Sequence, residues 1–479
     1  MLKSIIHTTE NNNSYIYDDQ HRLSMLIHPD FIKANDNIMD ADPYYFEKKN
    51  YLQSYGLFTN SKLVDFAYLD EYMVNEDFIE TKQIVFEVTD SCNLNCAYCA
   101  FGDLYEVFDE RVIKNINNQY AINLLKYLFN LKPKNKKDKV YISFYGGEPL
   151  LNFNFIKQVV DITNKIKSEK EINIGYSMTT NATLINKHIK FLVENNFKLL
   201  ISLDGDEDNH SYRSFKKNNE NSFQIVINNI DIIKNDYPEY FKEHISFNAV
   251  LHDKNSVKEI YEFIYKRYRK IPRISELNRE NIKPAKEDLF LNMFNSKRKS
   301  ENEYQKINSE MLNITHNSTL LYKELTDFLK YFSINYYMSN IPVLLNLNEI
   351  FLPSNTCLPF SKKIFLTSRN KLLPCEKINY KFFMGQVNEE VIINIPEITK
   401  QMNFYYSHLK KECQKCYVYK FCGVCLFRLK NFEKLGTEDF FCDSFHDHKS
   451  FIHKLNRIFA FLEKYPNDFF QILENLIIA

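Results

Sequence analysis

The stretch QIVFEVTDSCNLNCAYC, residues 83–99, joins a β-rich run to three closely spaced cysteines. After it the chain alternates short β-rich runs with helical patterns that repeat apolar residues at intervals of three and four. Strands are expected at 83–89, 140–145, 172–178, 198–203 and 245–251, with a sixth near 273–281. Helices are expected at 121–131, 155–166, 186–196, 223–234 and 257–268. This alternation predicts the α/β class, with βα units around a parallel sheet.

The composition excludes several classes of protein. Hydrophobic residues make up 44% and charged residues 25% of the 479 residues, as in a folded globular chain. The 61 basic residues equal the 61 acidic ones, so no global field draws the chain to nucleic acid or an anionic membrane. No apolar run reaches the roughly 18 residues of a membrane span, and the first residues lack the apolar core of a secretory signal. We therefore expect a cytoplasmic protein that binds neither nucleic acid nor membrane.

The ten cysteines are expected to be metal ligands or catalytic thiols, because disulfides are rare in a reducing compartment. Cys92, Cys96 and Cys99 directly follow the first predicted strand, at the end where parallel barrels carry their active sites. Three thiolates leave one iron of a four-iron cluster open to another ligand. The alternative is a zinc site completed by a distant histidine, but the next one, His188, falls in a predicted helix.

The CxxxCxxC spacing with Tyr98 before its last cysteine resembles the hallmark of radical S-adenosylmethionine (SAM) enzymes. Three further motifs follow in that family's order, each at the end of a predicted strand. They are GGEP (Gly146, Gly147, Glu148, Pro149), TNAT beginning at Thr180 and Asn181, and SLDG (Ser202 and Asp204) followed by His210 and Arg213. The resemblance implies a partial (β/α)6 TIM-like barrel that binds SAM.

The resemblance also assigns roles to these residues. It implies that GGEP meets the amino group of SAM, that Thr180 and Asn181 approach the ribose, and that Arg213 binds the carboxylate. The physical chemistry agrees, because two glycines allow a close approach of backbone, and a guanidinium fork suits a carboxylate. Taken alone, a polar residue such as Asn181 or His210 is as well explained as a cap of a βα loop.

The remaining seven cysteines gather in the last third of the chain. Their spacing is too tight for a zinc ribbon and resembles the SPASM domain, an extension of radical SAM enzymes that holds two auxiliary iron-sulfur clusters. A zinc-stabilised module is the alternative. The resemblance places Cys413, Cys416, Cys422 and Cys442 on one cluster, and Cys357, Cys375 and Cys425 on the other. Three [4Fe-4S] clusters and SAM are thus the expected cofactors.

Glu376 follows Cys375 directly, at the position where sulfatase-maturing relatives place an acidic residue proposed as a base. A carboxylate there is suited to accept the proton lost when a substrate radical is oxidised. The alternative is a solvated surface glutamate.

These patterns predict five segments. They are an N-terminal domain (1–80), a radical SAM partial barrel (81–290), a helical connector (291–350), a SPASM domain (351–450) and a C-terminal helix (451–479). In the first segment, SYIYDD and LSMLIH are expected to form a hairpin followed by helices. Such a segment resembles the winged-helix-like domain with which peptide maturases bind a leader peptide as an added strand. A plain structural cap explains it equally well.

The resemblance implies an oxidoreductase that acts on a peptide or protein. Its expected reaction forms a 5'-deoxyadenosyl radical and installs a thioether, ether or carbon-carbon cross-link in a ribosomally made precursor peptide (RiPP maturation). Its expected partners are that precursor, with its leader sequence, and an external one-electron reductant of flavodoxin or ferredoxin type. The alternative is anaerobic maturation of a sulfatase by formylglycine formation. A non-catalytic metal-binding scaffold is the alternative from another class, with basic stretches at 266–273 and 297–299.

Overall fold

The structure is a computed structural model that describes residues 4–60, 63–133, 138–307, 319–336 and 351–478. It contains two compact units, each assembled from distant segments of the chain. Unit 1 combines Met1–Tyr68, Thr319–Thr356 and Met402–Ala479, and unit 2 combines Leu69–Ser318 and Cys357–Gln401. The predicted segment 351–450 is thus divided between the two units, and the five domain boundaries stay predictions.

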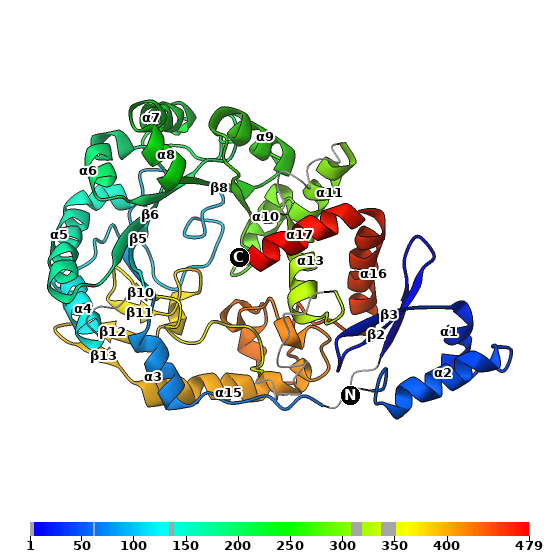
Figure 1. Ribbon diagram of the computed structural model, residues 1–479. Coiled ribbons are helices and arrows are strands. Elements are labelled where there is room, and N and C mark those ends of the chain that lie inside the picture. Colours follow the sequence, from blue (N-terminus) through cyan, green and yellow to red (C-terminus); the bar gives the residue numbers. More distant parts are fainter. Residues whose placement is uncertain (1–3, 61–62, 134–137, 308–318, 337–350, 479) are drawn as a thin grey trace. The chain divides into compact units, whose positions relative to one another are not determined.

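Unit 2 is built on one curved sheet of ten strands (Figure 1). Six of them run parallel in chain order, as expected of a partial barrel. They are β4 (Gln83–Thr89), β5 (Val140–Gly146), β6 (Ile174–Thr180), β7 (Lys198–Ser202), β8 (Ile245–Leu251) and β9 (Arg273–Glu276). The predicted α/β class and barrel are therefore correct, and each strand lies within two residues of its predicted start.

Helices cover the outer face of this sheet (Figure 1). They are α4 (Asn118–Leu131), α5 (Phe153–Lys170), α6 (Ile189–Glu194), α7 (Phe223–Asp236), α8 (Pro238–His244) and α9 (Val257–Tyr268). In α4, Asn117 caps the first turn, and the stripe Ala121, Leu124, Leu125 and Leu128 is buried. Full burial of one such leucine contributes about 2 kcal/mol. The helix expected over 186–196 is shorter, because a 3-10 turn at Ile185–Lys187 precedes it.

The other edge of the sheet is formed by the second chain segment of unit 2, Cys357–Gln401. Strand β10 (Ile364–Leu366) pairs in parallel with β4, and β11 (Lys371–Leu373), β12 (Gly385–Val387) and β13 (Val391–Ile393) continue the sheet in antiparallel order. β4 is therefore an interior strand, and six of its seven residues are buried. Part of the cysteine-rich segment thus completes the barrel sheet, an arrangement that the sequence patterns do not reveal.

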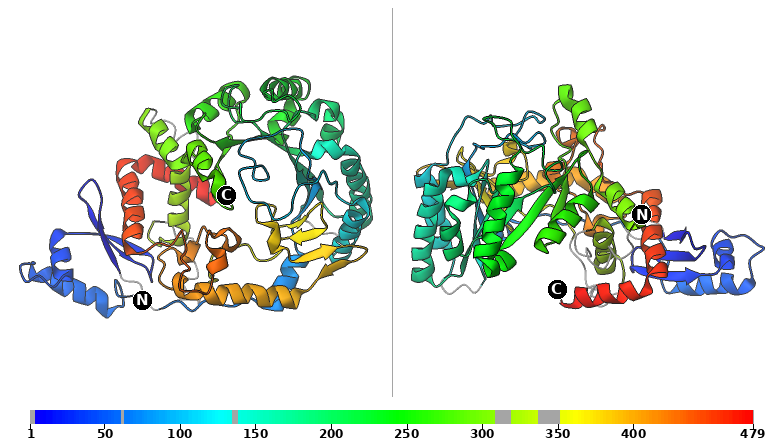
Figure 2. Two further views of the ribbon diagram at one scale, coloured as in Figure 1. Left: turned by 180° about the vertical axis from the view of Figure 1, so that it is seen from behind. Right: turned by 90° about the horizontal axis from the view of Figure 1, so that it is seen from above.

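Unit 1 contains a separate antiparallel sheet in the order β1-β2-β3. Its strands are β1 (Ile5–Thr8), β2 (Ser14–Asp18) and β3 (Leu23–Ile27), followed by α1 (Pro29–Asn35) and α2 (Pro43–Ser54). The expected hairpin corresponds to β2 and β3, whereas β1 was not expected. Figure 2 shows the sheet beside α1 and α2. Helix α16 (His448–Lys464) packs on β1, where Glu463 accepts hydrogen bonds from Thr9, Asn11 and Tyr15.

The remaining helices are α3 (Glu71–Ile79), α10 (Glu287–Met293), α11 (Lys297–Ile307), α13 (Leu320–Tyr331), α15 (Ile395–Cys413) and α17 (Pro466–Ile478). Helices α11 and α13 lie within the segment expected as a helical connector (291–350), of which 308–318 and 337–350 lie outside the described residues, and the connector itself stays a prediction. None of the helices in the described part of the chain is long and apolar enough to cross a membrane.

Candidate active site

The loop that carries Cys92, Cys96 and Cys99 leaves the C-terminal end of β4 and is fixed through its backbone. The amide of Asn95 donates to the Ser214 carbonyl at 2.8 Å, and that of Ala97 donates to the Tyr212 carbonyl at 3.2 Å. The three thiols lie within electrostatic range of one another, and burial raises the pKa of Cys96 to about 12. The structure therefore brings together the first predicted group of ligands.

Gly146 and Gly147 end β5 against the residues that lead into this loop. Gly146 has a positive φ of 131°, and a Cβ on Gly147 would lie 1.8 Å from the Ser91 carbonyl oxygen. The amides of Gly147 and Glu148 donate to the Thr89 and Ser91 carbonyls at 2.9 and 2.8 Å. Glycine is thus required here because two backbone segments meet, and this contact sets the position of Cys92.

Glu148 is buried and joins the ends of β5 and β6. Its carboxylate accepts hydrogen bonds from the Leu150 amide at 3.1 Å, the Thr180 hydroxyl at 2.8 Å and the Asn181 amide at 2.8 Å. Desolvation raises its pKa to about 7, although these donors favour the charged form. Pro149, also buried, begins the 3-10 turn Pro149–Asn152 that follows.

Asn181 reaches from β6 to the cysteine loop. Its side-chain amide donates to Asn93 Oδ1 at 2.9 Å and lies 3.8 Å from the Cys92 sulfur. Its carbonyl oxygen accepts from the Thr183 amide and hydroxyl, which fixes its orientation. Between them, Ala182 adopts a positive φ of 61°, where the family motif has glycine. Asn181 is thus a contact of the loop rather than a simple cap.

Asp204, Arg213 and Tyr98 form a buried polar group behind the loop. Arg213 donates to Asp204 through Nε at 2.8 Å and Nη2 at 3.1 Å, and the Tyr98 hydroxyl donates to Oδ2 of the same carboxylate. Burial opposes ionisation of Asp204, but the Arg213 guanidinium beside it lowers its pKa below the ordinary value. The Tyr98 ring also stacks on His252, with centroids 5.5 Å apart.

This geometry gives the motif that begins at the end of β7 a role within the protein, beside its expected contact with SAM. Two nitrogens of Arg213 are used within the protein, where they hold Asp204 and hence Tyr98 of the cysteine loop. His210 Nδ1 accepts from the Asp204 amide at 3.4 Å, so it supports the same turn. Ser202 is the half-buried last residue of β7.

Glu376 lies in unit 2 after β11 and is 12% exposed, so it is not a freely solvated surface group. Lys363 Nζ donates to both carboxylate oxygens, at 3.0 and 2.9 Å, and the Cys375 sulfur lies 3.7 Å from Oε2. Tyr145, the residue before the two glycines, lies within electrostatic range of Glu376 and Cys99, and burial raises its pKa.

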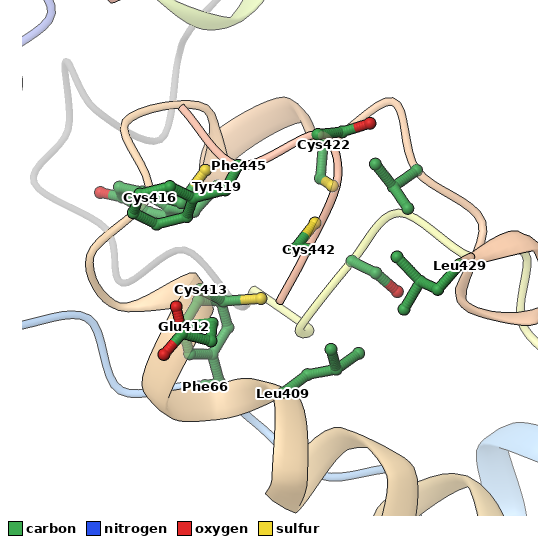
Figure 3. A pocket seen from close by; sticks show the side chains of 13 residues that line it. Phe66, Leu409, Glu412, Cys413, Cys416, Tyr419, Cys422, Leu429, Cys442 and Phe445 are labelled. Atoms are coloured by element: carbon green, nitrogen blue, oxygen red, sulfur yellow. The ribbon is translucent and has the colours of Figure 1, made fainter. Parts of the chain in front are cut away.

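Four of the seven remaining cysteines line one cavity in unit 1 (Figure 3). Cys413, Cys416, Cys422 and Cys442 line this cavity together with apolar side chains such as Leu409 and Leu429. Figure 3 shows the sulfurs of Cys413, Cys422 and Cys442 directed into the same space. Burial raises the pKa of Cys413 to about 12 and that of Cys442 to about 11. These are the four cysteines that the family resemblance assigns to one auxiliary cluster.

The third predicted set is not brought together within one unit. Cys357 and Cys375 belong to unit 2 and Cys425 to unit 1, so this set stays a prediction. Among the described residues, no three His, Cys, Asp or Glu side chains are arranged to hold a single metal ion.

Comparison with known proteins agrees with this site. Residues 86–264, from β4 through most of α9, match the model of the radical SAM superfamily. The chain contains a radical SAM domain. It is 26% identical over 382 residues to a cysteine-type anaerobic sulfatase-maturating enzyme of Clostridium novyi, covering 78% of this chain and 94% of that enzyme. It is 30% identical over 179 residues to the radical SAM cyclopropyl synthase TigE of Paramaledivibacter caminithermalis, covering 36% of each chain.

Among solved structures, anSMEcpe with bound AdoMet is similar in fold, with a TM-score of 0.53 and 19% identity. The match covers 82% of this chain and 99% of that chain. Both this relative and the sulfatase-maturating enzyme are thus matched over nearly their whole length, while about a fifth of this chain has no counterpart in them.

The sequence motifs miss two groups near the cysteine loop, the buried Glu87 and the half-buried Tyr145. Glu87 in β4 accepts hydrogen bonds from the Ser368 amide and the Tyr380 hydroxyl, both at 2.9 Å, and pairs with Arg111 at 3.3 Å. The charged residue within the apolar run QIVFEVT was the signal that could have identified it. For Tyr145 the only sequence signal was weaker, namely its position directly before the GGEP motif.

Proposed function

We propose that this radical SAM enzyme binds a [4Fe-4S] cluster at Cys92, Cys96 and Cys99 and modifies a ribosomally made peptide. The single observation that carries the proposal is the cysteine loop itself, in which three close thiols stand at the end of β4 beside a glycine cradle. Three thiols and a close backbone approach fit a cluster that keeps one iron open. When bound, the cluster and SAM supply a hydrogen-abstracting radical.

The residues around the cysteine loop hold it in position. Glu148 and Asn181 tie the ends of β5 and β6 to the loop, and Asp204 with Arg213 holds Tyr98 from the other side. Gly146, Gly147, Thr180 and Arg213 remain our proposed contacts of SAM. Buried hydrogen bonds of this kind orient ligands and exclude water.

The cavity in unit 1 is our proposed site of an auxiliary [4Fe-4S] cluster. Four thiols around one space fit such a cluster, because each of its four irons takes one cysteine. A second auxiliary cluster at Cys357, Cys375 and Cys425 would bring the total to three. An external flavodoxin- or ferredoxin-type protein is the proposed electron donor.

Two observations support a peptide substrate: the relatives of this chain and the N-terminal sheet β1-β2-β3. Enzymes named as sulfatase-maturating are similar to most of the chain, and one structural neighbour contains a bound peptide. The fifth of the chain that they lack leaves room for a module that reads a leader sequence. We assign this role to the sheet β1-β2-β3, since extended peptides bind by adding a strand to a sheet.

Glu376 is the proposed base at the substrate. Its carboxylate oxygens are held by Lys363, so the group is positioned to accept a proton as the product bond forms. The expected product is a cross-linked peptide that has lost two hydrogens.

Formylglycine formation on a sulfatase is a second candidate, favoured by the extent of the similarity to sulfatase-maturating enzymes. In that reaction the thiol of a substrate cysteine is replaced by an aldehyde oxygen. The mass of the product separates the two candidates.

The deciding experiment is anaerobic reconstitution, followed by incubation with SAM, a reductant and two sets of peptides. One set is encoded by short reading frames beside the gene, and the other is a cysteine-containing sulfatase peptide. Loss of two hydrogens from a peptide of the first set supports the proposal, and an aldehyde on the second set supports the alternative. Zinc in place of iron, or no 5'-deoxyadenosine in the loaded protein, contradicts both.

A further inference from the structure

A buried ion pair in unit 1 connects the N-terminal sheet to the cysteine cavity. Asp19 follows β2 directly, and Lys420 lies in the 3-10 turn Tyr419–Phe421, between Cys416 and Cys422. Lys420 Nζ lies 2.6 Å from Asp19 Oδ1, and the side chains are 3% and 0% exposed. Two residues about 400 positions apart in sequence therefore meet away from water.

The turn that carries Asp19 is rigid. Asp18, the last residue of β2, accepts hydrogen bonds from the amide of His21 at 2.9 Å and from the amide of Phe58 at 2.5 Å. The hairpin is paired in register from Ser14 to Ile27. The sheet and the Asp18 side chain thus fix the backbone from which Asp19 extends to Lys420.

The turn that carries Lys420 belongs to the cavity. Tyr419 lines the cavity, and Lys420 Nζ lies over the Tyr419 ring, 4.3 Å from its centroid. The turn contains three of the five residues that separate Cys416 from Cys422, so its position sets the distance between these thiols.

A second, independent contact joins the same two regions. Tyr417, next to Cys416, stacks on Phe451 of α16, with ring centroids 5.4 Å apart. Tyr17 of β2 packs on Phe451 from another side, with centroids 5.7 Å apart. The segment that follows Cys416 is therefore connected to the hairpin at two places, at Lys420 through charge and at Tyr417 through aromatic rings.

A buried charge whose partner is removed is strongly destabilising, whereas removal of both charges is much better tolerated. The Asp19–Lys420 pair therefore makes the position of the cavity turn dependent on the hairpin. We propose that Asp19 and Lys420 are positioning residues that make the N-terminal sheet a structural part of the auxiliary-cluster site. The cluster itself rests on the proposed function, whereas the coupling between hairpin and cavity does not.

The test compares full-length D19N, K420M and the double variant D19N/K420M with wild type. D65N serves as the matched control, because Lys410 Nζ lies 2.7 Å from Asp65 in the same unit but the aspartate is 93% exposed. The first measurements are iron per chain and the midpoint potential of the auxiliary cluster from a redox titration followed by electron paramagnetic resonance.

Each single variant is expected to lose about four irons per chain or to shift that midpoint potential, while the Cys92/Cys96/Cys99 cluster keeps its signal. The double variant is expected to recover towards wild type, and D65N to match it. The proposal would be overturned if the single variants matched wild type in iron content and midpoint potential, or if the double variant departed further from wild type than either single variant. The double variant keeps the test decisive if a single variant does not fold.

A second measurement does not depend on any cluster. In iron-free full-length protein, the alkylation rates of Cys416 and Cys422 are read by mass spectrometry, with Cys92, Cys96 and Cys99 as internal references. The single variants are expected to raise the first two rates about ten-fold or more, and leave the references unchanged. Unchanged rates contradict the coupling. A wild type without auxiliary iron contradicts the proposed cofactor alone.

Discussion

The two cysteine sites are built in different ways. In unit 2, three cysteines within eight residues follow one strand, and the ends of neighbouring parallel strands fix their loop. In unit 1, four cysteines spread over thirty residues converge without regular strands, at the end of α15 and in irregular turns. The first site depends on short backbone contacts and the second on packing between segments far apart in the sequence.

This difference means that the two sites should respond differently to similar changes. A site fixed by neighbouring strand ends is sensitive to any change of backbone, whereas a site fixed by side chains is sensitive to loss of distant partners. The predictions below test this contrast, beginning with the largest expected effect.

Removing the ligands should separate the two sites most clearly. Replacing Cys92, Cys96 and Cys99 with alanine is expected to abolish 5'-deoxyadenosine formation and to remove about four irons per chain. Replacing Cys413, Cys416, Cys422 and Cys442 should remove a similar amount of iron but leave SAM cleavage in place. Iron analysis and an anaerobic assay for 5'-deoxyadenosine check both results. Loss of SAM cleavage in the second variant would show that the sites are not independent.

Gly147→Ala tests the backbone contact at the first site. The added Cβ would lie 1.8 Å from the Ser91 oxygen, so the variant is expected to lose at least about 3 kcal/mol of stability, and its first cluster. Gly423→Ala, between two cysteines of the other group, is the matched control, because no atom lies within 4 Å of its Cβ position. Urea unfolding and iron content measure both. Equal tolerance of the two changes would remove the basis of the contrast.

Glu148 should give the fold of unit 2 a pH dependence. Its pKa is raised from 4.5 to about 7 in the folded state, so the native protein binds more protons than the unfolded chain between these values. Its contribution is therefore fully present below pH 4.5, and about 3 kcal/mol is lost as pH rises through 7. Urea midpoints at pH 5 and pH 8 measure this slope. Glu148→Gln should flatten it, and an unchanged slope would assign the pH dependence to other groups.

Tyr98→Phe removes one hydroxyl from the group behind the cysteine loop. Asp204 keeps its bonds from Arg213 and from the Val250 amide, so the expected loss is only about 1 kcal/mol. Tyr212→Phe is the control, since its hydroxyl donates to the exposed Asp253 and its ring lies beside that of Tyr98. Thermal unfolding compares the two. A larger loss for Tyr212→Phe would contradict the role given to Asp204.

The smallest effect is expected at Ala182, where the backbone has a positive φ. Ala182→Gly relieves the strain of a left-handed alanine but increases the freedom of the unfolded chain, so a gain of up to about 1 kcal/mol is expected. The melting temperature should rise by a few degrees at most. A fall would show that the Cβ of Ala182 contributes packing that outweighs its strain.

The sequence predicts the barrel strands and the loop of the first site because strand periodicity and motif spacing are local. The sequence does not predict that two nitrogens of Arg213 donate hydrogen bonds to Asp204, since a motif contains no information about the direction of a side chain. The three-residue strand β10 is too short to show a period, and its pairing with β4 is a contact of long range. Strand β1 was missed as well, and the single helix expected over 451–479 is divided into α16 and α17. Neither the sequence around Asp19 nor the sequence around Lys420 predicts the contact between these two residues.

The pairing of β4 with β10 also affects how the protein folds while it is being synthesised on the ribosome. Glu87 and Ser368, which meet beside these strands, are 281 positions apart in the chain. At the usual speed of translation, about 5 to 20 residues per second, the edge of β4 stays open for roughly 15 to 60 s after it leaves the ribosome. An apolar strand with an open edge invites pairing with other chains during that interval. Chaperones that cover the open edge during synthesis should therefore raise the yield of folded protein.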